Sequence, residues 1–552
     1  MTSSGDSENG NLQSEESSEP GEVLLSYRDN GFLHRLREVS GELNHDWIII
    51  KGNRKIPVNL LKGEELLDAA IDQASCISLS QKESENLHYQ SFPRWDEKAL
   101  TDLERGDVKI GVVPEGRGQR IRITSAGSRY ELVYQNHLLK DPSPSYILSR
   151  LNAKDHRFSV DLLGMSYWKL EGRNIPWMMM IRYPEGTITG FSPYLSDLNK
   201  LLGSAVRLHS DDLRSFLFDL TRSEERSSYE LSREIGRAIG ELQGCLILDS
   251  VEHGKGDTEG DRILRLFSRS KLDMQEIGSD LGRISVYMDE VKKGLIKIIG
   301  DRSSVSGGRK QRVVRSLGQN DPIKGLSLLR TALNQRQKRL RERFSGIRSF
   351  KGSPLVPSGL DCSLDHLDLD SNQKPYFRKF DWTFHDQEGG KVTKVLPLKD
   401  LALVLNSLKK ARYLSSTRIM ERAARGRDLG RLDLLFLEYN LAKESYTSMM
   451  RDLNAFLYVR RRDIPFRYVF LTSIVSSIWY EKNRNSLILG YNEGLSGTEN
   501  EDLLIYPKGA DTLEGIRLMQ ILTSLSSASR TLSEGMKSRV GLESDILTAL
   551  SI

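Results

Sequence analysis

The amino-acid sequence predicts an α+β protein with two lobes, the first rich in strands and the second mainly helical. In the first part of the chain, short stretches alternate apolar with polar residues and are separated by turns that contain glycine. From Asp211 onward the apolar residues recur every three or four positions, as in Leu231, Ile235 and Ile239, which is typical of helices. At 552 residues the chain exceeds the usual size of one compact core, so we expect two or three packed units.

The composition is that of an ordinary globular protein, with 38% hydrophobic and 28% charged residues. The 80 basic and 75 acidic residues leave a net charge of only +5, which does not indicate nucleic acid as a partner. Cys76, Cys245 and Cys362 lie far apart and form no CxxC pair. We therefore expect neither a disulfide framework nor a zinc cluster.

The chain shows no sign of membrane insertion. No run of residues approaches the roughly 20 apolar positions that span a bilayer. The first twenty residues are polar and acidic, whereas a signal peptide is cationic and then apolar. We expect a cytoplasmic protein without a membrane partner.

The first hundred residues divide into a tail and a small cap. Residues 1–21 are rich in Ser, Glu, Gly and Asn, and they should form a disordered tail because few apolar side chains can offset the entropy of ordering. Residues 22–105 should form a cap subdomain. In the cap we expect a short amphipathic helix from Phe32, followed by strands at 47–51 and 55–61.

Residues 106–190 are predicted to form a β-rich N-lobe. The expected elements are strands at 107–111, 119–124 and 129–135, a helix at 144–152, and a strand pair at 166–169 and 177–183. This order corresponds to a small antiparallel sheet that carries one helix.

Residues 191–552 are predicted to form the helical C-lobe, with a hairpin at 359–382 around the turn Asp370–Gln373. A basic insertion spans 301–348, and its part from Arg309 onward holds twelve Lys or Arg against two acids. We favour a solvent-facing helix over an RNA-binding arm, because aromatic residues that could stack on bases are scarce there.

Three stretches carry a resemblance to a known family. His45–Ile56 places an aromatic residue and a basic turn before a strand, and residues 129–151 have the length of a strand, a loop and a helix. Residues 396–405 read Leu-Pro-Leu-Lys-Asp-Leu-Ala-Leu-Val-Leu. In order and spacing these stretches resemble the maltokinases, in which the last reads Ser-Pro-Leu-Arg-Asp-Val-Ala-Gly-Met-Leu. The resemblance implies the bilobal, protein-kinase-like fold that maltokinases share with aminoglycoside phosphotransferases.

The resemblance also implies that ATP and Mg²⁺ are used to phosphorylate a maltose-like sugar. In such enzymes a strand Lys grips the nucleotide phosphates and a helix Glu holds that Lys. Aligned on the resemblance, the Lys position falls on Leu132 and the Glu position on Tyr146, and neither residue type can do this work. Lys140 on the nearby loop and Tyr183 at the hinge are the candidates left for contact with the nucleotide.

The family's His-Gly-Asp catalytic loop has no literal match, and three placements are open. Asp361 as the catalytic residue puts His366 at the metal position, whereas Asp368 puts Gln373 there. A third placement puts Cys362 in the catalytic role, which would be inert. Asp361 fits the length of the hairpin best.

Two further positions complete the implied site. Asp381, after the second hairpin strand, is the expected metal ligand. Asp400 is similar to the aspartate that braces the family's catalytic loop, although a helix N-cap would suit it equally. Gln243 stands where the corresponding helix normally carries a His. Trp479 and Tyr480 lie in the region that such enzymes use for substrate, but we favour a role in core packing.

Two hypotheses about function follow. The chain is either an active sugar kinase of the maltokinase type, or a catalytically impaired pseudokinase that serves as a binding or regulatory module. The partner of such a module would be an enzyme of α-glucan or trehalose metabolism. The missing Lys and Glu favour the pseudokinase.

Overall fold

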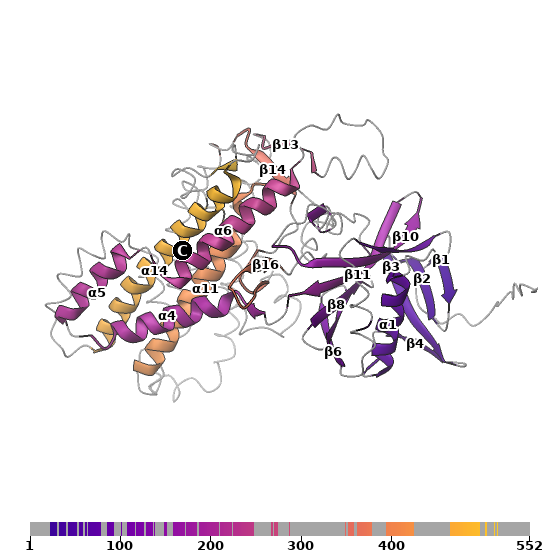
Figure 1. Ribbon diagram of the computed structural model, residues 1–552, viewed down its shortest axis with the longest axis horizontal. Coiled ribbons are helices and arrows are strands. Elements are labelled where there is room, and N and C mark those ends of the chain that lie inside the picture. Colours follow the sequence, from indigo (N-terminus) through magenta and orange to yellow (C-terminus); the bar gives the residue numbers. More distant parts are fainter. Residues whose placement is uncertain are drawn as a thin grey trace, which may run out of the picture. The chain divides into compact units, whose positions relative to one another are not determined.

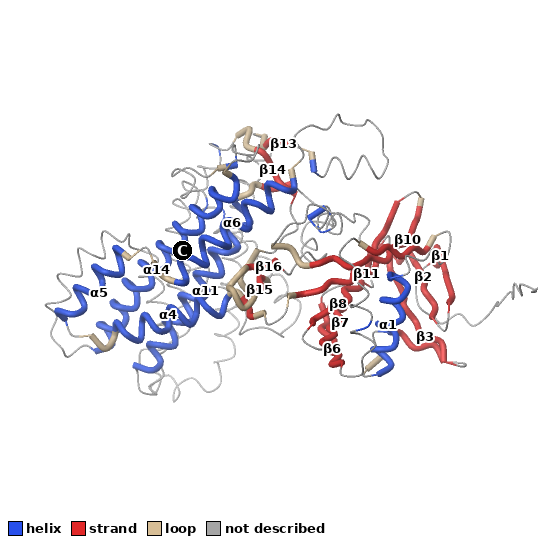
Figure 2. Tube along the Cα trace, in the orientation of Figure 1, coloured by secondary structure: helices blue, strands red, loops and turns tan. Residues whose placement is uncertain are grey.

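The computed structural model describes most of residues 22–78, 86–92, 108–138, 158–247, 351–377, 394–423 and 464–496, together with a few isolated positions. These residues belong to two compact units. One unit comprises Met1–Pro142 with Leu162–Arg182, and the other comprises Ser143–Asp161 with Tyr183–Ile552. Figure 2 shows that strands dominate the first unit and long helices the second, which confirms the predicted order.

The first unit contains two antiparallel sheets. The elements of the five-stranded sheet are β1 (Glu22–Asp29), β2 (Phe32–Val39), β3 (Glu42–Lys51), β4 (Arg54–Pro57) and β9 (His137–Leu138), which pairs with β3. The six-stranded sheet has the order β5 (Leu87–Ser91), β10 (Asp161–Leu170), β11 (Arg173–Tyr183), β8 (Ser128–Gln135), β7 (Gly118–Ser125) and β6 (Val108–Glu115). Helix α1 (Glu64–Ser78) packs with them. The predicted strands at 107–111, 119–124, 129–135, 166–169 and 177–183 are confirmed.

The helix predicted from Phe32 is wrong, because this segment is strand β2. Its backbone pairs with β1 on one side, where Phe32 faces Asp29, and with β3 on the other, where Val39 faces Glu42. The apolar spacing of Leu33 and Leu36 is compatible with a helix, but the pairing on both sides decides the conformation. The sequence signal that we missed is Asn30-Gly31, a strong marker of a two-residue hairpin turn.

Both sheets and α1 contribute side chains to one hydrophobic core. Trp47 comes from the predicted cap, whereas Tyr134 and Trp177 come from the predicted N-lobe. Their rings meet the Trp47 ring edge to face, with centroids 5.5 and 5.7 Å from its own. Aromatic pairs of this geometry add to the stabilisation from burial alone. The cap is therefore part of the same folding unit as the six-stranded sheet.

Two fully buried histidines lie in the middle of this core. The Nε1 of Trp168 donates a hydrogen bond of 2.7 Å to Nδ1 of His45. His45 must therefore carry its proton on Nε2, which faces Nδ1 of His34 at 3.5 Å. Burial lowers the pKa of His34 to about 3, and it lowers the pKa of His45 well below its usual value. Both rings are therefore neutral near pH 7.

We expect the first unit to lose stability as the pH falls from about 6.5 towards 3. In this window the unfolded chain binds protons at His34 and His45 and the folded chain does not, so each histidine lowers the free energy of unfolding by up to about 1.4 kcal/mol per pH unit. Chemical denaturation followed by tryptophan fluorescence measures this slope. His34→Phe keeps an aromatic ring in the core and should reduce the slope. An unchanged slope in this variant would show that His34 is not buried neutral.

The second unit is built from long helices and two small sheets (Figure 1). The helices are α4 (Phe191–Ala205), α5 (Ser210–Arg222), α6 (Ser227–Leu246), α11 (Leu398–Ala423) and α14 (Ile464–Leu495). One small sheet has the order β12 (Ile188–Thr189), β15 (Leu367–Leu369) and β16 (Pro375–Phe377), and the other has the order β13 (Ser270–Lys271), β14 (Pro354–Pro357) and β17 (Lys394–Val395). None of the helices in the described part of the chain has the length and apolarity that a bilayer span requires.

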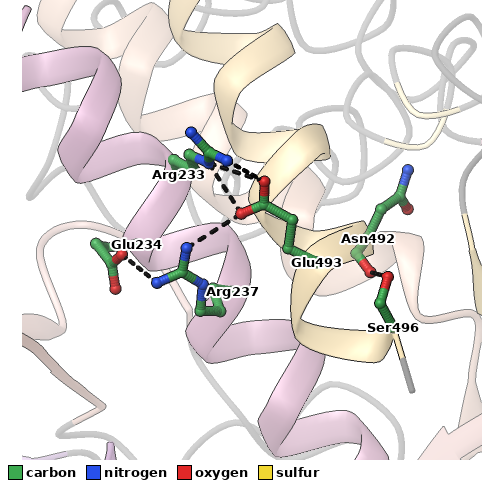
Figure 3. Close-up of polar contacts among 6 residues, drawn as sticks. All are labelled: Arg233, Glu234, Arg237, Asn492, Glu493 and Ser496. Carbon is green, nitrogen blue, oxygen red and sulfur yellow. Dashed lines mark hydrogen bonds and ion pairs between the residues drawn. The ribbon is translucent and has the colours of Figure 1, made fainter. Parts of the chain in front are cut away.

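Helices α6 and α14 approach so closely that only glycine fits at four contact points. A Cβ atom at Gly236 or Gly240 would collide with the backbone of α14, and one at Gly490 or Gly494 would collide with the backbone of α6. Figure 3 shows the polar edge of this interface, where Arg233 and Arg237 of α6 both bind a single carboxylate, that of Glu493. Hydrogen bonding from Arg233 holds the pKa of Glu493 below its usual value. Within the described residues of the helical unit, this helix pair leaves no room for a side chain at the four glycine positions.

Gly236→Ala should destabilise the helical unit by about 3 kcal/mol, because the added methyl group meets the rigid backbone at Leu487 and cannot be relieved by a rotamer change. Gly203→Ala in α4 is the matched control, since nothing lies within 4 Å of its Cβ position. The control should raise stability by about 0.5–1 kcal/mol. Thermal and urea unfolding measure the change in the free energy of unfolding for both variants. Equal effects of the two substitutions would mean that the helices do not meet as closely as described.

Candidate functional site

The predicted catalytic loop lies between β14 and β15. Strand β14 ends at Pro357, and His366 directly precedes β15. The backbone N–H of His366 donates to the carbonyl of Ser363 at 2.9 Å, and the Ser363 hydroxyl lies 3.1 Å from His366 Nδ1. These bonds close a tight turn that fixes the imidazole at the entrance to the hairpin.

The structure separates the two alternative metal ligands of the sequence prediction. Asp368 lies within β15, 2% exposed, and is paired with Thr189 of β12 and Tyr376 of β16. Gln373 lies in the exposed turn at the far end of the hairpin, with φ at 61°. Since the three-residue strand β15 stands between them, His366 and Gln373 occupy opposite ends of the hairpin.

The turn of this hairpin is shaped by Asp370. Its carboxylate oxygen Oδ1 accepts hydrogen bonds from the backbone N–H groups of Asn372 at 2.8 Å and Lys374 at 2.9 Å. A short acidic side chain that bonds to its own turn is a common use of Asp. The hairpin predicted around residues 370–373 is therefore confirmed.

Several predicted residues lie outside the described residues. They are Asp361, Asp381, Lys140, Tyr146, the tail 1–21, most of the helix at 144–152 and the insertion 301–348 apart from Arg348. Cys362, next to Asp361, is described and completely buried. Tyr183 ends β11 and is 2% exposed. The roles predicted for Asp361, Asp381, Lys140 and Tyr183 stay predictions.

Two positions that the family resemblance singled out meet in the helical unit. The Gln243 amide of α6 donates to the Asp400 carboxylate at 2.7 Å and to the carbonyl of Pro397 at 3.1 Å. Its oxygen accepts from the Tyr491 hydroxyl of α14 at 2.8 Å. Asp400 lies in the first turn of α11 and not at its N-cap, and its role as a brace of the catalytic loop stays a prediction. Gln243 thus joins α6, α11 and α14.

Gln243→Leu should cost about 2–4 kcal/mol, because it leaves the buried Asp400 and Tyr491 without these hydrogen bonds. Tyr491→Phe removes only one of the bonds and should cost about 1 kcal/mol. Urea denaturation of both variants and the wild type measures the difference. If the two variants lower the free energy of unfolding equally, the Asp400 contact contributes nothing to stability.

Asp197 of α4 links three side chains of other segments, and the sequence analysis did not predict this role. Its carboxylate accepts hydrogen bonds from Arg226 at 2.7 Å, Ser228 at 2.8 Å and the Trp479 indole at 2.9 Å. Trp479 is completely buried, and Tyr480 is also buried, with the Lys409 Nζ 3.9 Å from its ring centroid. Both aromatic residues therefore pack in the core, which is the role that the sequence favoured.

In the first unit, strand β8 presents its residues to two faces. Leu132 is completely buried and belongs to the core shared with the cap. Glu131 points to the opposite face, where its Oε1 binds Arg122 Nε at 2.9 Å and an Arg129 nitrogen at 2.5 Å. Strand β8 contains no lysine, and the guanidinium groups of Arg122 and Arg129 are engaged by Glu131. A nucleotide grip of the usual Lys–Glu kind is not found on this strand.

The described side chains do not make a magnesium site. No group of three His, Cys, Asp or Glu side chains converges within the part of the chain that the structure describes. His366 offers a nitrogen, whereas Mg²⁺ prefers oxygen ligands in octahedral geometry. The carboxylates that would suit the ion, Asp361 and Asp381, lie outside the described residues.

Comparisons with known proteins agree with this architecture. Neither a family model nor a curated protein sequence matches the chain. Solved structures do match. A glucosamine kinase in complex with glucosamine, ADP and inorganic phosphate has a TM-score of 0.57 at 10% identity and covers 98% of this chain and 94% of its own. The same type of enzyme in crystal form A gives 0.56 at 10% identity, covering 97% and 91%.

At such low identity the likeness establishes the fold alone. The chain has a kinase-like phosphotransferase fold, with a β-rich N-terminal region and a helical C-terminal part. This confirms the fold class that the sequence predicted.

Proposed function

We propose that the chain is an ATP-dependent phosphotransferase that acts on a hydroxyl group of a maltose-like sugar. The observation that supports this most directly is the anchoring of Cys362 and Leu364, which follow Asp361. In the sequence, Asp361 stands four residues after the end of β14 and directly before the buried Cys362. The loop in which it stands is fastened to α11, because the Leu364 N–H donates to the Ser407 hydroxyl at 3.0 Å.

The proposed reaction moves one phosphoryl group. The Asp361 carboxylate takes the proton of the sugar hydroxyl, and the sugar oxygen forms a bond to the γ-phosphorus of ATP. The bond between that phosphorus and the bridging oxygen breaks, and ADP leaves with the electron pair. Asp381 is the proposed ligand of Mg²⁺, the ion that offsets phosphate charge in reactions of this class.

The substrate class rests on two kinds of likeness. The sequence resembles maltokinases, and solved structures of a glucosamine kinase match over nearly the whole chain. Maltose and glucosamine are therefore the first sugars to test, in a coupled assay that detects ADP release.

Asp361→Asn should lower kcat by about 10³-fold with the best sugar, because the amide cannot accept the hydroxyl proton. Asp368→Asn is the matched control, since Asp368 lies buried within β15, and kcat should stay within about threefold of the wild type. Circular dichroism confirms that each variant is folded. Loss of turnover in Asp368→Asn together with normal turnover in Asp361→Asn would reverse the assignment of the base.

A pseudokinase is the second candidate, and strand β8 is the observation that favours it. Leu132 occupies the position aligned with the family's phosphate-gripping Lys and is buried in the core. Without a replacement cation, turnover would fall by orders of magnitude. The chain would then act as a binding or regulatory module for an enzyme of α-glucan or trehalose metabolism. A thermal-shift titration separates the two candidates, because millimolar ATP stabilises only a protein that binds it.

A further inference from the structure

Helices α11 and α14 of the second unit are joined by buried polar side chains. Arg412 of α11 is 5% exposed, and its guanidinium donates hydrogen bonds to the hydroxyl groups of Ser476, at 2.9 Å, and Ser477 of α14. One turn earlier on α11, the Lys409 Nζ lies 3.9 Å from the centroid of the Tyr480 ring. As the residue number rises along α11 it falls along α14, so the two helices run antiparallel in this contact.

The antiparallel register brings three further hydroxyl groups to the next turn of the contact. Ser415 and Ser416 lie three and four positions after Arg412, which places them on the same side of α11 one turn further on. Thr472 lies four positions before Ser476, which places it on the same side of α14, also one turn further on. The three hydroxyl groups therefore belong to the layer next to the arginine.

These three hydroxyl groups are buried without a protein partner. Ser415, Ser416 and Thr472 are all completely buried, and their side-chain oxygens make no hydrogen bond within the part of the chain that the structure describes. They therefore do not bond to one another. In native proteins, buried hydroxyl groups are nearly always hydrogen-bonded, either to protein groups or to ordered water.

Ordered water is the ligand that suits this layer. A buried water molecule makes about three hydrogen bonds, typically to polar groups that have no other partner. A hydroxyl group can both donate and accept, as water can, so one water molecule can satisfy all three side chains. Where no direct hydrogen bond forms between α11 and α14, a bridging water can link them with nearly the same enthalpy.

We propose that ordered water bound by Ser415, Ser416 and Thr472 bridges α11 and α14. The water continues the polar contact between the two helices beyond the direct hydrogen bonds of Arg412. Because α11 also holds the loop before β15 through Ser407, the bridge stiffens the helix to which that loop is attached.

A double-mutant cycle tests the bridge. Urea denaturation gives the folding equilibrium constant of the wild type, Ser416→Ala, Thr472→Val and the double variant. Each single substitution should lower this constant by about threefold to tenfold, because the water loses one of its partners. The double variant should lose clearly less than the product of the two single effects, because both hydroxyl groups bind the same water.

Ser232→Ala combined with Thr472→Val is the matched control pair. Ser232 is equally buried, but its hydroxyl bonds directly to Tyr194, at 2.9 Å, and to Asn483, at 2.8 Å. Since Ser232 and Thr472 share no partner, their effects on the folding equilibrium constant should multiply.

Three results would overturn the proposal. A rise in the folding equilibrium constant on loss of either hydroxyl would mean that the group is buried dry. Effects of Ser416→Ala and Thr472→Val that multiply, as in the control pair, would mean that each hydroxyl has a partner of its own. A crystal structure of the wild type should show a water about 2.6–3.2 Å from at least two of the three oxygens, and its absence would refute the bridge. These measurements concern folding alone, so they decide the question whether or not the chain phosphorylates a sugar.

Discussion

The contact between α6 and α14 is the constraint on which the helical unit depends. At Gly236, Gly240, Gly490 and Gly494 the two backbones lie against each other, so neither helix can rotate or slide without a collision. Gln243 of α6 and Tyr491 of α14 lie on this same interface, and Gln243 extends the contact to Asp400 of α11. The three helices thus form one rigid support. The loop before β15 is attached to that support through Ser407 of α11.

A rigid support of this kind is what phosphoryl transfer requires. The reaction demands little covalent chemistry from the protein, and most of the rate enhancement comes from holding groups in place and offsetting charge. Under the proposed function, the helical unit provides the first of these through the hydrogen bonds of Gln243. As for the second, Arg122 of β7 and Arg129 of β8 are engaged by the Glu131 carboxylate.

The first unit illustrates how strand alternation decides chemistry. In β8, neighbouring residues point to opposite faces, so Leu132 enters the core while Glu131 takes the other side. The position aligned with the family's lysine lies on the core side, where a charged group would be costly. The core on that side also holds His34 and His45 among tryptophan rings, and it joins the cap to the six-stranded sheet.

The sequence by itself determined the strands between residues 107 and 183, helix α6 and the hairpin around Asp370, because alternation, helical spacing and turn residues act within a few positions of the chain. Strand β2 was misjudged, since its conformation depends on pairing with two neighbours. Only the tertiary structure decided which side chains meet. Gln243 reaches Asp400 across 157 positions of the chain, and Lys394 reaches Ser268 across 126. Such contacts arise from the packing of helices and the order of strands, which no local pattern of residues encodes.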